Sequence, residues 1–86
     1  MANILYFSTT WCGPCKAFKP VVQEVAAETG KAVQYIDAEQ NAQLAAQYNV
    51  TGVPTIIVAE GNTVMHRHTG AMSKQQLKSF FSSLSW

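Results

Sequence analysis

The chain has 86 residues, enough for one small domain that buries roughly 60 to 65% of the surface its unfolded form exposes, and we expect residues 1–86 to form that single domain. Six Lys and Arg against five Asp and Glu give a net charge of +1, and these charges are scattered along the sequence. This pattern excludes the basic stripe of a nucleic-acid-binding protein, and no apolar run is long enough to span a membrane, so we expect partners recognised by shape and apolar contact.

The first half of the chain alternates between strand and helix spacing. Residues 4–7 are an apolar run and form the first predicted strand. The helix predicted after it ends at Gly30, a typical left-handed cap. Pro20 lies inside this helix, and because the apolar stripe runs unbroken across it, we expect a kink rather than an end. A second strand is predicted over residues 33–36. The apolar stripe of the helix consists of Phe18, Val21, Val22, Val25 and Ala26.

A short alanine-rich helix is predicted over residues 41–48. Its first turn is expected to use Asp37 or Asn41 as a cap, and Asn49 is the expected C-terminal cap. For Asp37 and the nearby Glu39 we favour this capping role over any part in catalysis.

The second half predicts a hairpin and a closing helix. Residues 55–59 are a nearly continuous apolar strand, residues 60–62 a turn, and residues 63–69 the strand that pairs back. The last helix opens with Ser73-x-x-Gln76, the pattern of a capping box. The predicted order is βαβαββα, an alternating α/β domain. The apolar face of the last helix consists of Leu77, Phe80, Phe81 and Leu84.

The only two cysteines stand in the sequence Cys12-Gly13-Pro14-Cys15, between the first strand and the first helix. Two intervening residues let one helical turn bring both sulfurs within bonding distance, and the free N–H groups and dipole of that turn favour a thiolate on Cys12. Cys12 is the candidate nucleophile, and Cys15, one turn deeper, is the candidate resolving thiol. Pro14 costs little in a first turn, and Gly13 lets a partner's backbone approach. The motif predicts thiol-disulfide exchange.

A structural thiol pair, or half of a metal site, is the alternative interpretation of these cysteines, and we do not favour it. Zinc usually needs four ligands, often two such cysteine pairs, and the chain has one pair. His66 and His68 share one face of a predicted strand, which is the spacing of a metal-binding pair, but we expect solvent exposure for them.

The chain contains the motifs Trp11 through Lys16, Pro20, Gly52-Val53-Pro54-Thr55, Gly70-Ala71 and the stretch from Ser73 to Phe80. In these motifs it resembles the thioredoxin family, and the resemblance covers nearly the whole chain. The resemblance begins at the family's central strand, so the usual first strand and helix are absent, and it implies a minimal thioredoxin fold: a four-stranded mixed sheet flanked by three helices.

The resemblance implies that Pro54 follows a cis peptide bond and faces the cysteines. It also implies that the backbone of Val53 is free to pair with an extended substrate segment. The implied rim that holds protein substrates consists of Trp11, Gly13, Pro14, Val53, Pro54, Gly70 and Ala71. Core packing is the alternative for Trp11, and we favour the rim because Trp11 directly precedes the reactive turn.

The chain departs from the family where thioredoxins bury an aspartate six residues before the first cysteine. That position is Tyr6, whose phenol is a poor base near neutral pH, so we expect it to pack and to donate a hydrogen bond. Val33 and Ser8 replace two residues that usually accompany the aspartate. Deprotonation of Cys15 is then left to water or a nearby acid. Lys16 is the second candidate for tuning, by favouring a thiolate electrostatically, with simple exposure on the helix face as the alternative.

The expected function is general protein-disulfide reduction with no bound cofactor. The resemblance implies two partners, disulfide-containing protein substrates and a thioredoxin reductase that passes on electrons from NADPH. A glutathione-dependent glutaredoxin is the alternative enzyme, favoured by the short architecture and opposed by the Gly-Pro between the cysteines. A non-catalytic binding subunit is the alternative from another class. We expect a monomer in the reducing cytoplasm, because no signal segment is present at the N-terminus and the charge is near neutral.

Overall fold

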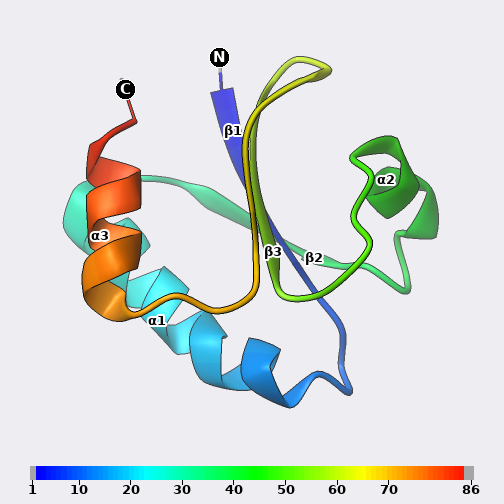
Figure 1. Ribbon diagram of the computed structural model, residues 1–86, viewed down its shortest axis with the longest axis horizontal. Coiled ribbons are helices and arrows are strands. Elements are labelled where there is room, and N and C mark those ends of the chain that lie inside the picture. Colours follow the sequence, from blue (N-terminus) through cyan, green and yellow to red (C-terminus); the bar gives the residue numbers. More distant parts are fainter. Residues whose placement is uncertain (1, 85–86) are drawn as a thin grey trace.

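The computed structural model describes residues 2–84, and over this range the element order is the predicted βαβαββα (Figure 1). Each predicted element is present, and the strands at 4–7, 33–36 and 55–59 extend beyond their predicted ends. The elements are β1 (Ala2–Ser8), α1 (Gly13–Thr29), β2 (Val33–Asp37), α2 (Ala42–Gln47), β3 (Thr55–Glu60), β4 (Thr63–Thr69) and α3 (Lys74–Ser82).

The four strands form one mixed sheet in the order β2-β1-β3-β4. Strand β1 runs parallel to β2 and antiparallel to β3, and β3 and β4 form the antiparallel hairpin. The parallel register places Ser8 directly opposite Asp37 at the ends of their strands. The central strands β1 and β3 are buried on both faces, which explains why they appear in the sequence as continuous apolar runs.

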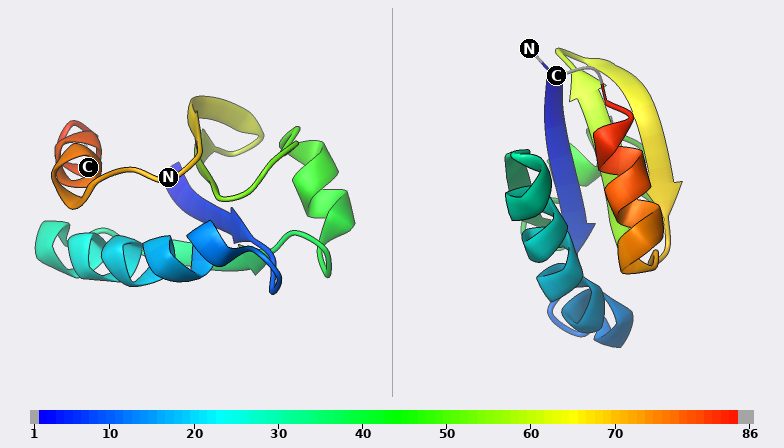
Figure 2. Two further views of the ribbon diagram at one scale, coloured as in Figure 1. Left: turned by 60° about the horizontal axis from the view of Figure 1, so that its bottom comes forward. Right: turned by 90° about the vertical axis from the view of Figure 1, so that its left-hand side faces the viewer.

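Helices α1 and α3 cover one face of the sheet and α2 covers the other (Figure 1). Alternate side chains of β1 point to opposite faces of the sheet and pack into separate apolar clusters. Ile4 and Tyr6 face α1 and α3, while Leu5 and Phe7 face α2. Figure 2 shows α1 and α3 lying side by side on their face. Three exposed ion pairs also join these two helices, Lys74 with Glu24, Lys74 with Glu28, and Lys78 with Glu28.

Helix α1 continues through Pro20, as its apolar stripe predicted. It ends where Gly30 takes a left-handed conformation with φ of 68°, and the Gly30 N–H donates to the carbonyl of Ala26. Helix α3 begins with the predicted capping box, in which the Ser73 side chain accepts from the Gln76 N–H and the Gln76 side chain accepts from the Ser73 N–H. Both ends were predictable because they depend on neighbouring residues alone.

The start of α2 differs from its prediction. Asn41 is the N-cap, but its side chain makes no capping hydrogen bond to the helix and donates instead to the carbonyl of Asp37. The Asp37 carboxylate accepts the N–H groups of Glu39 and Gln40, so it closes the turn before the helix rather than capping the helix itself. The Glu39 side chain is exposed, so Glu39 contributes to this turn through its N–H alone. Tyr48 is the C-cap of α2, and Asn49, the predicted cap, takes the left-handed conformation one residue later, with φ of 55°.

Candidate functional site

Cys12 and Cys15 form a disulfide at the N-terminus of α1. Their Cα atoms are 5.2 Å apart, and only 5% of Cys12 and 2% of Cys15 is exposed. The Cys12 sulfur is the N-cap acceptor of the helix, because it accepts the Cys15 N–H at 3.2 Å. In this position a thiolate on Cys12 would face the free N–H groups and the positive end of the helix dipole.

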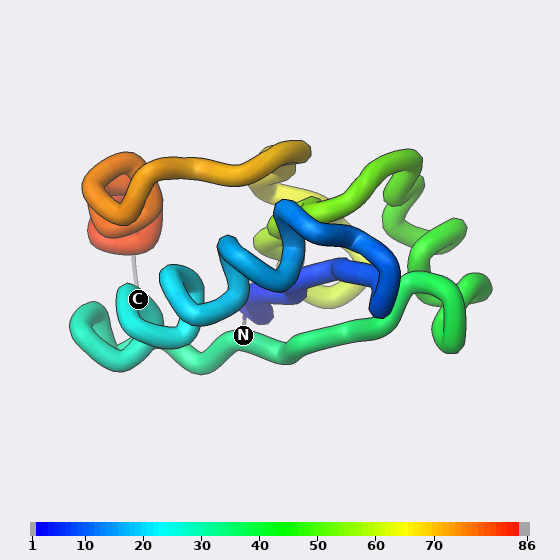
Figure 3. Tube along the Cα trace, turned by 90° about the horizontal axis from the view of Figure 1, so that it is seen from below, coloured from blue at the N-terminus to red at the C-terminus, as the bar shows by residue number. Residues whose placement is uncertain are grey.

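Backbone hydrogen bonds on both sides of Cys12 fix the position of the two cysteines relative to β1 and α1. The Cys12 N–H donates to the Thr9 carbonyl at 3.4 Å, and the Lys16 N–H donates to the Cys12 carbonyl at 3.2 Å. Figure 3 shows the turn before α1, in blue, at the same end of the molecule as the green segment that carries α2. The redox pair therefore lies at the C-terminal end of β1, where loops from several elements meet.

Tyr6 on β1 contacts the backbone of Cys15. Its hydroxyl donates to the carbonyl oxygen of Cys15 at 2.9 Å, and its ring packs against Phe18 and Tyr35. Burial, with a smaller contribution from Tyr35, raises the pKa of Tyr6 to about 12. Tyr6 is therefore a neutral hydrogen-bond donor with a packed ring, and it cannot act as a base near neutral pH. The sequence predicted packing and a donated hydrogen bond, but not which atom accepts it.

The loop before β3 contains the cis peptide bond between Val53 and Pro54 that the resemblance implied. The Pro54 carbonyl accepts the N–H of Gly70 at 2.8 Å, so the segment after β4 lies beside this loop. Within residues 2–84 the Val53 backbone has no hydrogen-bond partner. Trp11 is 69% exposed, which excludes core packing. Trp11 and Val53 line one groove of about 300 Å³.

Several other predicted site residues lie on the surface of the protein. Gly13, Pro14 and Ala71 are exposed, and a Cβ built on Gly13 would meet no atom within 4 Å. Lys16 is exposed on α1.

The two histidines lie away from the cysteines, on β4. His66 is exposed and its ring meets that of Phe80 edge-on, while His68 is half-buried. Within the described range, residues 2–84, no group of three or more His, Cys, Asp or Glu side chains could hold a metal ion. In the same range no helix is long and apolar enough to cross a membrane.

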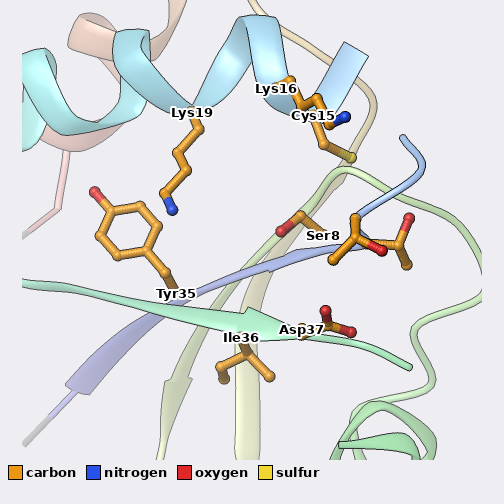
Figure 4. A pocket seen from close by; sticks show the side chains of 9 residues that line it. Ser8, Cys15, Lys16, Lys19, Tyr35, Ile36 and Asp37 are labelled. Carbon is orange, nitrogen blue, oxygen red and sulfur yellow. The ribbon is translucent and has the colours of Figure 1, made fainter. Parts of the chain in front are cut away.

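A second pocket opens beside Cys15 and was not predicted from the sequence. It has a volume of about 300 Å³ and lies between the start of α1 and the ends of β1 and β2 (Figure 4). No local sequence pattern indicates it, because it forms only when three separate elements pack together. Its lining residues are Ser8, Thr9, Thr10, Cys15, Lys16, Lys19, Tyr35, Ile36 and Asp37.

A mixed sheet whose central strand leads into a Cys-x-x-Cys helix N-terminus, together with a cis-proline before β3, defines the class of dithiol-disulfide oxidoreductases. The family model described as Thioredoxin matches residues 2–83. The chain belongs to the thioredoxin family.

Individual relatives agree with this assignment. A thioredoxin of Staphylococcus aureus is 40% identical over 77 residues, which cover 87% of this chain and 74% of that protein. The chloroplastic thioredoxin Y of rice is 37% identical over 73 residues, 83% of this chain, and the match spans only 44% of that longer protein.

Solved structures show the same fold. A mutant thioredoxin from Halobacterium salinarum matches with a TM-score of 0.89 and 33% identity, covering 99% of this chain and 75% of that one. The germline-specific thioredoxin Deadhead of Drosophila melanogaster matches with a TM-score of 0.86 and 28% identity, covering 96% and 80%. Together with the Cys12–Cys15 disulfide, this membership makes the chain a thiol-disulfide oxidoreductase.

Proposed function

We propose that the chain is a general protein-disulfide reductase in which Cys12 attacks and Cys15 resolves. The Cys12 thiolate displaces one sulfur of a substrate disulfide and forms a mixed disulfide with the other. Cys15 then loses its proton and attacks the Cys12 sulfur, which forms the intramolecular disulfide and releases the second substrate thiol. The observation that carries this order is the position of Cys12 as N-cap of α1, where the Cys15 N–H already meets its sulfur.

The proposed substrate surface is the groove between Trp11 and Val53, together with its neighbours. An extended substrate segment would pair with the free backbone of Val53 as an added strand, which would place its disulfide near the redox pair. The exposed indole of Trp11 offers apolar area to the same segment. The residues assigned to this surface are Trp11, Gly13, Pro14, Val53, Pro54, Gly70 and Ala71.

Electrons are proposed to come from NADPH through a thioredoxin reductase, without a cofactor bound to this chain. The family supports a reductase partner and disulfide-containing protein substrates. A reducing compartment such as the cytoplasm suits a protein that works from its dithiol form, and a monomer leaves the groove open to substrates.

Insulin reduction tests the reductase. The oxidised protein is mixed with NADPH and thioredoxin reductase, or with NADPH, glutathione and glutathione reductase, and the loss of NADPH absorbance is followed. Turnover with the first system alone is expected. Turnover with glutathione alone would make it a glutaredoxin-like enzyme, and no turnover in either would favour a non-catalytic binding subunit.

Cysteine variants test the two roles separately. Cys12→Ser is expected to abolish reduction, because the attacking thiol is lost. Cys15→Ser is expected to accumulate the mixed disulfide, which mass spectrometry of the unreduced complex detects. Partner binding by a variant lacking both thiols would instead point to the non-catalytic role.

A further inference from the structure

The resolving step requires Cys15 to lose a proton, yet its side chain is 2% exposed. The buried hydroxyl of Tyr6 donates to the Cys15 carbonyl, and its high pKa keeps it neutral. Tyr6 therefore offers no acceptor for this proton, and the route out must lie elsewhere.

The pocket beside Cys15 provides such a route. Figure 4 shows the Cys15 sulfur directed toward the pocket from α1 and the Asp37 carboxylate on its far side, with Ser8 between them in this view. The volume of about 300 Å³ leaves room for several water molecules, each of which occupies about 30 Å³ in the liquid.

Thr9, which lines this pocket, gives a second reason to expect water in it. Its hydroxyl oxygen is buried and has no hydrogen-bond partner within residues 2–84, and Thr9 itself is 8% exposed. A buried hydroxyl without a partner is costly, so native proteins pair such groups with protein atoms or ordered water. Thr9 lines both this pocket and the groove beside Trp11, so a water in either would satisfy its hydroxyl.

The charged groups that face this space come from α1 and β2. Lys16 and Lys19 lie on α1, and the Lys19 amine is 5.3 Å from the centre of the Tyr35 ring. Tyr35 stays neutral because burial raises its pKa. Asp37 on β2 is the carboxylate that lines the pocket, and only its Oδ1 is committed to the Glu39 and Gln40 N–H groups. Its other oxygen remains to accept from pocket water.

We propose that the proton of Cys15 leaves through water in this pocket to Asp37, which acts as the proton acceptor for the resolving step. The inference rests on the proposed function, since it concerns that step alone. The Cys15 S–H bond breaks, water carries the proton to the Asp37 carboxylate, and the new thiolate attacks Cys12. The Cys12–Cys15 bond forms, the substrate sulfur leaves as a thiolate, and Asp37 returns its proton to solvent.

Ellman's reagent separates the two steps in one experiment. The reduced protein releases one coloured thiolate when Cys12 attacks and a second when Cys15 resolves, so stopped-flow absorbance gives one phase for each step. The variant is Asp37→Asn, whose amide oxygen can still accept the turn's N–H groups. The matched control is Glu39→Gln, which removes an exposed carboxylate that does not line this pocket.

The expected result is an unchanged first phase and a second phase slowed by about three- to tenfold near neutral pH in Asp37→Asn only. This is less than the ~10²–10⁴-fold typical of a direct general base, because water relays the proton. The second phase should also need a higher pH to reach its maximum, and added imidazole, a soluble base, should restore it.

Whether Asp37→Asn slows or speeds the second phase distinguishes proton transfer to Asp37 from a purely electrostatic effect of its charge on Cys15. If Asp37 acted only through its charge, its removal would lower the pKa of Cys15 and speed the second phase. A second phase that is unchanged or faster in Asp37→Asn therefore overturns the inference. A wild-type protein that releases only one thiolate would overturn the proposed function as well, so the two failures are distinguishable.

Discussion

At the scale of single residues, Tyr6 connects the central strand to the redox helix. Its hydroxyl holds the carbonyl of Cys15, one turn before Pro20, which has no N–H to donate to the preceding turn. The helix is thus fastened to β1 near the point where its own hydrogen bonding is interrupted.

Removing the Tyr6 hydroxyl should weaken the fold more than the chemistry. Tyr6→Phe keeps the ring and leaves the Cys15 carbonyl without this donor, which should lower the free energy of unfolding by about 1–3 kcal/mol. Urea unfolding of the oxidised protein measures the loss. The first phase with Ellman's reagent serves as the control and should not change, whereas an unaltered stability would show that the hydrogen bond is not formed in solution.

Tyr6 also predicts a loss of stability at alkaline pH. The unfolded chain releases its phenolic proton near pH 10, whereas the pKa of folded Tyr6 is about 12. The unfolded state therefore binds fewer protons above pH 10, so stability is fully present below pH 10 and falls as pH rises toward 12. The loss should approach about 3 kcal/mol.

Thermal unfolding followed from pH 9 to 11.5 measures this loss, with Tyr6→Phe as the reference. If both proteins lose stability equally over this range, Tyr6 is not the group responsible.

At the scale of elements, the short helix α2 is held by a side chain from the opposite edge of the sheet. Arg67 on β4 donates to the carbonyls of Tyr48 and Asn49, at 2.6 and 3.2 Å, just where α2 ends and Asn49 takes its left-handed conformation. A helix of this length is marginal without tertiary contacts, so this pair of charge-assisted bonds helps to fix it.

Arg67→Ala should therefore loosen α2 and the loop that follows it. We expect a loss of about 1–2 kcal/mol and faster amide hydrogen exchange in residues 42–49, with the α1 amides unaffected. Arg67→Lys is the matched control, because it keeps the charge but cannot bond both carbonyls with one planar group. Exchange that remains unchanged in both variants would contradict this role for Arg67.

Some features of these elements could be predicted from neighbouring residues in the sequence, and others could not. The capping box of α3 and the continuation of α1 through Pro20 were predictable from residue spacing alone. The turn that Asp37 closes, and the clamp by Arg67, depend on residues brought together by the sheet. No local pattern distinguishes such a side chain from one on the surface.

At the scale of the whole molecule, two apolar layers on opposite faces of one sheet stabilise the chain. The larger layer lies under α1 and α3, and Phe81 from α3 is fully buried in it. The ion pairs between the same helices lie on the outside, where 47% of the Lys74 side chain is exposed. Burial therefore outweighs charge in attaching α3, because exposed pairs are screened by water.

Phe81→Ala should cost about 3–5 kcal/mol, a large part of the total stability of a domain this small. Lys74→Gln should leave the melting temperature nearly unchanged, and the small effect should shrink further in high salt. Thermal unfolding of both variants tests whether burial of Phe81 contributes more to stability than the ion pairs of Lys74. A larger loss in Lys74→Gln than in Phe81→Ala would contradict it.

The fold and the redox pair were predictable at this scale, and the surroundings of Cys15 were not. Two cysteines at helical spacing indicate their chemistry by themselves, and the resemblance supplied the cis bond before Pro54. The pocket that joins Thr9, Lys19 and Asp37 forms only when α1 packs across β1 and β2. Its residues carry no motif, because each is ordinary in its own element.

The sulfur of Cys12 is also the acceptor that closes the first turn of α1. A thiolate accepts an N–H more strongly than a sulfur bonded to another sulfur, so this turn is held most firmly in the reduced, ionised protein. The unfolded chain lacks this preference. Folding stability and reduction potential are therefore linked in one thermodynamic cycle, and a substitution in this turn that stabilises the reduced and oxidised proteins unequally must also shift the reduction potential.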